Sequence, residues 1–257
     1  MNSTFWLQYY QQNRLNRPEP QWDLPPPADC PALRELARSL SHFQLGESGD
    51  GTFLLRHAHR AHADDPTYCA ALALYVQAEV SHALLLEKLV ARYRGRPVTS
   101  HWTHSLFRCV RRALGIGFEI QVLVIAELIG TAYYRLLGRL TADPVLKEVC
   151  AIVLRDEAQH IAFHAERLET DQAGLLPIER ALWVAQFQVL FLAAVQVAWM
   201  DHGAALRALG AQRREFIHEA RSECIQFLAS VAAAGACSRD ADEPSIPAVL
   251  KAKPSTL

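Results

Sequence analysis

The chain repeats one arrangement of glutamate and histidine, and this repeat limits its fold more than any other feature. Each copy has a lone glutamate and, about thirty residues later, a glutamate followed three positions on by a histidine. The two copies are Glu47 with Glu79 and His82, and Glu127 with Glu157 and His160. Residues three apart lie on one face of an α-helix, so the repeat predicts helices that bring these side chains together.

Turn signals predict where the helices begin. Asp65-Pro66 and Asp143-Pro144 each place an N-cap before a proline at the first helical position. After Pro31 the apolar residues recur at helical spacing. We expect helices over residues 31–62, weakened by glycines at 46, 49 and 51, and over 66–93, 104–113, 118–139, 144–172, 177–208 and 212–235.

The predicted fold is all-α, a four-helix bundle with two additional C-terminal helices. A hydrophobic content of 51% in 257 residues suits one large core. We expect a single helical domain over residues 31–235. Residues 1–30 are expected to form an N-terminal helix and a proline-rich strap, and residues 236–257 a disordered tail.

The six side chains of the repeat suit a site for two metal ions. Measured from the predicted turns near residues 64 and 142, they lie 15 to 18 residues along their helices, roughly 24 Å, and can meet at one depth of the bundle. Four carboxylates neutralise two divalent ions, and mixed oxygen and imidazole ligands favour iron or manganese. The alternative is that these groups hydrogen-bond across the core or face a water-filled groove.

A third Glu-x-x-His pair, Glu215 with His218, is not expected to bind metal. Arginines and glutamates surround it, as is typical of a solvated helix face, and no lone glutamate stands about thirty residues before it. Glu79 and Glu127, by contrast, lie in strongly apolar segments, where an unpaired carboxylate is costly to bury. Metal binding at the two complete sets would remove that cost.

With these residues the chain resembles the ferritin-like di-iron carboxylate superfamily over about residues 31–172, and within it the oxidase and oxygenase branch. Asp156 directly before Glu157 is similar to the D-E-x-x-H motif of that branch. The resemblance implies that Asp156 accepts a hydrogen bond from His82 and thereby orients it.

The position before Glu79 that corresponds to Asp156 holds Ala78. His160 therefore lacks the partner that the motif would give it. We expect Gln77 or Asp201 to serve in its place.

Further residues near the repeat are candidates for supporting roles. His164, one turn beyond His160, is a candidate extra ligand, because the similar arylamine N-oxygenases also carry an additional histidine on this helix. Tyr75 and Tyr134 are redox or hydrogen-bonding candidates, with ordinary core packing as the alternative. Small side chains beside Glu127 are expected to leave room for a substrate, namely Ala126, Gly130 and Thr131.

The resemblance implies an enzyme that activates O2 at two iron ions, with manganese as the alternative metal, and oxidises a small organic substrate held between the helices. It also implies an electron donor such as a ferredoxin or a flavin reductase. Two alternatives stay open. One is a hydroxylase of tRNA-bound or carrier-bound substrates, with arginines 92, 94, 96, 108, 111 and 112 holding phosphate; the other is a non-catalytic interaction protein stapled by metal.

Charge and cysteine content narrow the partners and the compartment. A formal net charge of −1 gives no general attraction to nucleic acid or to an anionic membrane. Six scattered cysteines without a C-x-x-C motif, and a start unlike a signal peptide, favour the cytoplasm.

One segment, Ala181–Met200, carries no formal charge and is long enough to span a bilayer. Its three glutamines favour a buried or oligomer-facing helix, and no other segment looks comparable. We therefore favour no membrane partner, and a homodimer through this helix stays open.

Overall fold

The computed structural model describes residues 1–28, 30–111 and 115–237, and within these ranges it is all-helical, with no strand. The prediction of an all-α protein is confirmed. The helices are α1 (Ser3–Leu15), α2 (Pro31–Glu47), α3 (Thr52–Ala61), α4 (Pro66–Arg92), α5 (Trp102–Arg111), α6 (Ile116–Leu140), α7 (Pro144–Gln172), α8 (Pro177–Ala208) and α9 (Arg213–Cys237). The predicted tail, residues 236–257, lies almost wholly outside the described residues.

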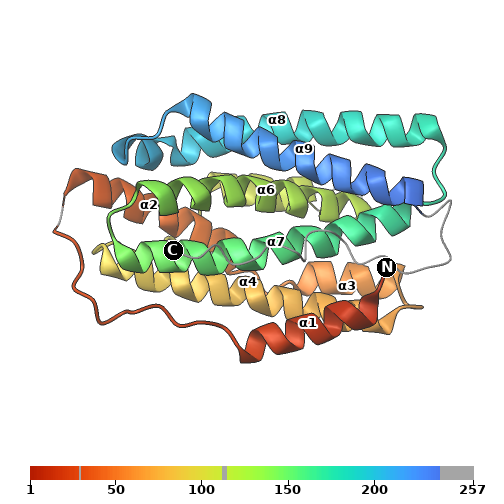
Figure 1. Ribbon diagram of the computed structural model, residues 1–257, viewed down its shortest axis with the longest axis horizontal. Coiled ribbons are helices and arrows are strands. Elements are labelled where there is room, and N and C mark those ends of the chain that lie inside the picture. The colour runs from red at the N-terminus through yellow and green to blue at the C-terminus, as the bar shows by residue number, and fades with distance from the viewer. Residues whose placement is uncertain (29, 112–114, 238–257) are drawn as a thin grey trace.

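The helices run roughly along one long axis (Figure 1). α2 packs along α4, α6 packs along α7, and α4 also contacts α7. α8 and α9 lie together on one side of this group, where they contact α2, α6 and α7, while α1 lies against α4 on the opposite side (Figure 1). The helices that carry the glutamate and histidine repeat are therefore the inner ones.

Two helix starts follow directly from the Asp-Pro signals. α4 begins at Pro66 and α7 at Pro144, as predicted. The Asp65 side chain accepts a hydrogen bond from Tyr68 N, and the Asp143 side chain accepts one from Val145 N. Each N-cap satisfies a backbone donor that the first helical turn leaves free.

The prediction of a single helix over residues 31–62 is wrong, because the helix is interrupted between α2 and α3. Gly51 is the N-cap of α3 and has φ +63°, a conformation that favours glycine. A Cβ on Gly51 would lie only 2.6 Å from Val76 Cγ2 of α4, so the turn needs glycine for space as well. Glu47 consequently stands at the end of α2, not in a helix interior.

The N-terminal helix predicted within residues 1–30 is present as α1, and one of its faces is buried against the other helices. Trp6 and Tyr10 of α1 are 3% and 2% exposed, and both rings contact Phe163 of α7 edge-on. The segment between α1 and α2 is non-helical and is held by Arg92, which donates to the carbonyls of Leu24 and Pro25.

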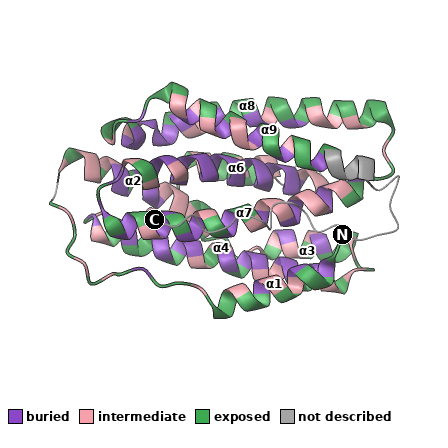
Figure 2. Cartoon of the chain, viewed as in Figure 1, coloured by how far each residue is buried: buried purple, intermediate pink, exposed green. Residues whose placement is uncertain are grey.

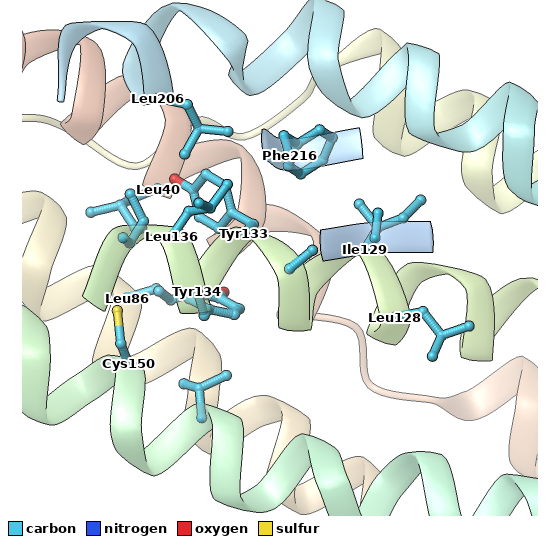
Figure 3. Close-up of a cluster of buried hydrophobic side chains, with 14 of the residues drawn as sticks. Leu40, Leu86, Leu128, Ile129, Tyr133, Tyr134, Leu136, Cys150, Leu206 and Phe216 are labelled. Carbon is cyan, nitrogen blue, oxygen red and sulfur yellow. The ribbon is translucent and has the colours of Figure 1, made fainter. Parts of the chain in front are cut away.

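The main hydrophobic core lies among α2, α4, α6, α7, α8 and α9. Figure 3 shows how Leu40, Leu86, Tyr134 and Cys150 approach one another from four different helices. Each is at most 1% exposed. This packing fixes the spacing of the helices that carry the candidate ligands.

Three helices in the described chain are long and apolar enough to cross a membrane, namely α4, α6 and α8. The expectation that no other segment is as long and apolar as residues 181–200 is therefore wrong. α4 and α6 are inner helices, but only 17% of the apolar window of α8 is buried (Figure 2). α8 is thus not a buried helix, and its outward face exposes large apolar side chains such as Leu182 and Val189.

Candidate metal centre

Both Glu-x-x-His pairs meet in the interior, one from α4 and one from α7. Glu79, His82, Glu157 and His160 each offer a ligand atom, and these atoms lie within 4.8 Å of one another. His160 Nδ1 is 2.8 Å from Glu79 Oε1, and His82 Nδ1 is 3.5 Å from Glu157 Oε1. Each histidine thus faces the glutamate of the other helix as well as its own.

The donor atoms of this group are buried but unsatisfied. Within the described part of the chain, Glu79 Oε1, His82 Nδ1, Glu157 Oε2 and His160 Nδ1 have no hydrogen-bond partner. Such groups normally pair when they are buried, because an unpaired buried polar atom costs free energy. The four side chains bring their ligand atoms together, and the mixture of carboxylate oxygen and imidazole nitrogen fits a divalent transition metal.

The two lone glutamates flank this group. Glu47 and Glu127 line the same cavity as Glu79 and Glu157. Desolvation, followed by the charge of Glu79, raises the pKa of Glu47 well above its usual value. Desolvation also raises the pKa of Glu127, with a further contribution from Glu157. Four carboxyl groups are therefore close enough to repel one another when no cation separates them.

In the metal-free protein the histidines supply that cation. Desolvation lowers the pKa of His82, but the hydrogen bond to Asp156 and the nearby carboxylates of Glu157 and Glu79 outweigh it and raise the pKa to about 9. For His160, desolvation also lowers the pKa, but Glu79 and Glu157 raise it well above its usual value. Protonated imidazoles thus balance the carboxylates, and a bound metal would replace their protons.

Asp156 lies where the sequence placed it, with Oδ2 3.2 Å from His82 Nε2 and no solvent exposure. Its other contacts come from a region that sequence reasoning did not connect to the site. Asn13 Nδ2 donates to Asp156 Oδ1 at 3.2 Å, and Arg17 lies 3.2 Å from Oδ2. The N-terminal helix and the residues just after it therefore hold the carboxylate that orients His82.

The expected partners of His160 are elsewhere, so that expectation is wrong. Gln77 is exposed and accepts a hydrogen bond from Arg14, because its position on α4 faces α1 and solvent. Asp201 is bound to His42, because α8 packs on α2 and not on α7 at this level. His160 Nε2 has no hydrogen-bond partner within the described residues, and its ring faces Tyr10 at 6.0 Å.

Two further candidates lie beside Glu127. The Tyr75 hydroxyl donates to Glu127 Oε1 at 2.8 Å, and His164 Nε2 lies 3.5 Å from the same oxygen. Both side chains are buried. His164 is therefore within reach of the site despite its offset of one turn, and Tyr75 is a hydrogen-bond donor to a candidate ligand.

Tyr134 and Thr131 are less directly involved. Both are buried, and neither hydroxyl has a hydrogen-bond partner among the described residues. Burial, followed by the charge of Glu47, raises the pKa of Tyr134 well above its usual value, which places the phenol in the field of the site. Neither Tyr134 nor Thr131 lines the cavity, so the structure does not support a substrate-facing role for Thr131.

A cavity of about 380 Å³ leads to the carboxylates. Ala126 and Gly130 line it, as the sequence predicted for a substrate space. The rest of the wall is largely apolar, with side chains from α2 to α6 and from α8. Its volume is in the range of small-molecule sites.

The third Glu-x-x-His pair, Glu215 with His218, does not line the cavity. His218 is exposed on α9, and Glu215 accepts a hydrogen bond from Gln212 N at 2.6 Å. The proposed phosphate-holding arginines are also dispersed, since Arg92 binds Asp143 at 2.8 Å and Arg111 binds Glu119 at 3.0 Å. Residue 112 lies outside the described residues.

Comparison of the chain with protein-family models, with curated proteins and with solved structures finds no match. The molecule itself establishes an all-helical protein with a buried group of two glutamates and two histidines that can hold a metal ion.

Proposed function

We propose that this protein is a ferritin-like di-iron carboxylate enzyme that uses O2 to oxidise a small organic substrate. In this proposal α2, α4, α6 and α7 are the four helices of the bundle. They carry the complete ligand set of such a site, one glutamate each from α2 and α6 and one Glu-x-x-His pair each from α4 and α7. Manganese in place of one iron ion would use the same ligands but would change the chemistry of the site.

The observation that carries the proposal is the set of unsatisfied donor atoms on both pairs. A static hydrogen-bonded core would pair Glu79 Oε1 and His160 Nδ1, yet these atoms approach to 2.8 Å without a properly aligned hydrogen bond. Buried carboxylate and imidazole atoms that lie together without hydrogen-bond partners suit the ligands of a common ion.

The bound iron pair would supply reduction of O2 and oxidising power for the substrate. The residues of this chain would hold the ions and position the ligands. Glu79, His82, Glu157 and His160 would hold the ions together with Glu47 and Glu127, and all four glutamates line the cavity. Tyr75 holds Glu127 in place by its hydrogen bond.

The cavity supports a small, largely apolar substrate. Ala126 is exposed although it lies in the middle of the buried helix α6, because its methyl group faces the cavity. Oxidation of such a substrate would need electrons from outside, so a ferredoxin or a flavin reductase remains the proposed donor.

Metal stoichiometry and O2 reactivity test the proposal together. Protein reconstituted with iron should hold about two ions per chain. After chemical reduction it should oxidise within seconds of mixing with O2, with a change in visible absorption. One tightly bound zinc ion would overturn the assignment, and two iron ions that never react with O2 would favour a structural metal staple.

A further inference from the structure

A second polar cluster lines the same cavity from helices that carry no Glu-x-x-His pair. His42 of α2 and Asp201 of α8 form its centre, with His42 Nδ1 2.8 Å from Asp201 Oδ1. The His42 side chain is 6% exposed and the Asp201 side chain 5% exposed. A carboxylate and an imidazole buried against each other in a cavity wall form an arrangement typical of proton-transferring groups.

His101, just ahead of α5, covers the pair. Its ring stacks on His42 with centroids 3.8 Å apart, and its side chain is 19% exposed. Thr103 joins His101 to the carboxylate, since its hydroxyl lies 2.7 Å from His101 Nδ1 and donates to Asp201 Oδ2 at 3.0 Å. The buried pair is thus connected to a side chain that reaches solvent.

The stacking of His42 on His101 argues against a shared metal ion at this cluster. The two rings are nearly parallel, with an interplanar angle of 24°, so their in-plane lone pairs do not converge on one point. His42, His101 and Asp201 do each offer a ligand atom within 4.8 Å of the others. However, His42 Nδ1, His101 Nδ1 and both oxygens of Asp201 already have hydrogen-bond partners within the cluster. The second cluster is therefore suited to carrying protons instead of metal.

The charges around Asp201 indicate which of the neighbouring imidazoles can exchange protons. The groups that face it are His42 on α2, His101, and His202 on α8. Arg38 on α2 acts on His101 and His202. Burial lowers the pKa of His202 to about 3, and its Nδ1 is engaged by Ser39 Oγ at 2.9 Å. His202 therefore stays neutral, and the charge of Asp201 is available to His42.

We propose that His42 is the proton-exchanging residue of the cavity and that Asp201 orients it. Because Nδ1 is held by Asp201, exchange takes place at Nε2. Protonated His42 gives its Nε2 proton to a group bound in the cavity, the Nδ1 proton stays on the bond to Asp201, and a proton from solvent restores the imidazolium. No electrons move in this step. The inference rests on the proposed function, because reduction of O2 consumes protons that must enter a largely apolar cavity.

The test uses His42→Gln and Asp201→Asn, with His218→Gln as the control. His218 is exposed on α9 and does not line the cavity. All variants should keep the iron content of the parent protein. In rapid mixing of reduced protein with O2, His42→Gln should slow the reaction about 100-fold, in the range of general acid–base catalysis. Added imidazole should restore part of the rate, whereas His218→Gln should react like the parent.

A second measurement does not depend on iron. In metal-free protein, nitrogen NMR of the imidazole ring should show the proton of neutral His42 on Nδ1, where Asp201 Oδ1 accepts it, and this preference should be lost in Asp201→Ala. A His42 tautomer that is the same in both proteins, or a His42→Gln variant as fast as His218→Gln, overturns the inference. A parent protein that does not react with O2 instead overturns the proposed function.

Discussion

His160 Nδ1 on α7 lies 2.8 Å from Glu79 Oε1 on α4, so the histidine of one Glu-x-x-His pair meets the glutamate of the other. A site built this way depends on both helices at once. Removing a ligand from either helix disturbs the whole centre, because the remaining carboxylates are left without their cation.

The first prediction concerns the ligands themselves. His160→Ala should lower bound iron from about two ions per chain to below about one, since an imidazole ligand is lost and Glu79 is left unpaired. His218→Ala, on exposed α9, should leave the iron content unchanged. Elemental analysis of both variants after the same reconstitution measures the iron content. Equal losses of iron in the two variants would contradict the assignment of His160, and not His218, as a metal ligand.

Asp156→Ala should weaken metal binding or the O2 reaction by roughly 10- to 100-fold, less than the loss of a ligand, because Asp156 orients His82 without binding metal. Chelator competition and stopped-flow spectroscopy measure the two effects. Glu148→Ala, which removes an exposed carboxylate earlier on the same helix, is the control. Parent-like behaviour of Asp156→Ala would contradict an orienting role.

Metal affinity should rise with pH. The pKa of His82 in the metal-free protein is about 9, so below that pH the ligand must lose a proton before it binds. Affinity should therefore increase by up to about tenfold per pH unit for each proton released, and the contribution of His82 should level off above pH 9. Isothermal titration in buffers of different ionisation enthalpy would count the protons. A pH-independent affinity between pH 6 and 8 would contradict the protonated state described for His82.

Filling the cavity should separate substrate access from metal binding. Gly130→Leu places a side chain beside Phe43 and Tyr134, where a Cβ alone meets both rings at ordinary distances of 3.9 and 3.8 Å. Iron content should be retained, while turnover or binding of a cavity ligand should fall by about 10- to 200-fold. Gly174→Ala, which meets no atom within 4 Å, is the control. Unchanged ligand binding in Gly130→Leu would place the substrate elsewhere.

The exposed face of α8 should mediate a homodimer. Leu182 and Val189 are 63% and 67% exposed and lie seven residues apart, on the same stripe of the helix. Replacing both by lysine should convert a dimer into a monomer in light scattering. Leu15→Lys, at an exposed leucine on α1, should not do so. A monomeric parent that binds neutral lipid vesicles through α8 would instead indicate a membrane contact.

Local sequence determined the elements that depend on neighbours along the chain. Asp65-Pro66 and Asp143-Pro144 marked the starts of α4 and α7, because an N-cap and a proline act within one helical turn. The spacing of Glu79 and His82 likewise placed both on one face, since helical geometry alone sets that relationship. The break after Glu47 was hinted at by glycines, but it was decided by the approach of Gly51 to Val76 on another helix.

What the tertiary structure alone decided is which face of each helix meets which partner. Asp201 binds His42 instead of His160 because α8 docks on α2, and Asp156 gains Asn13 and Arg17 because α1 folds back over α7. Such contacts join residues more than a hundred positions apart. They depend on packing among many side chains at once, and no periodicity within a single helix encodes them.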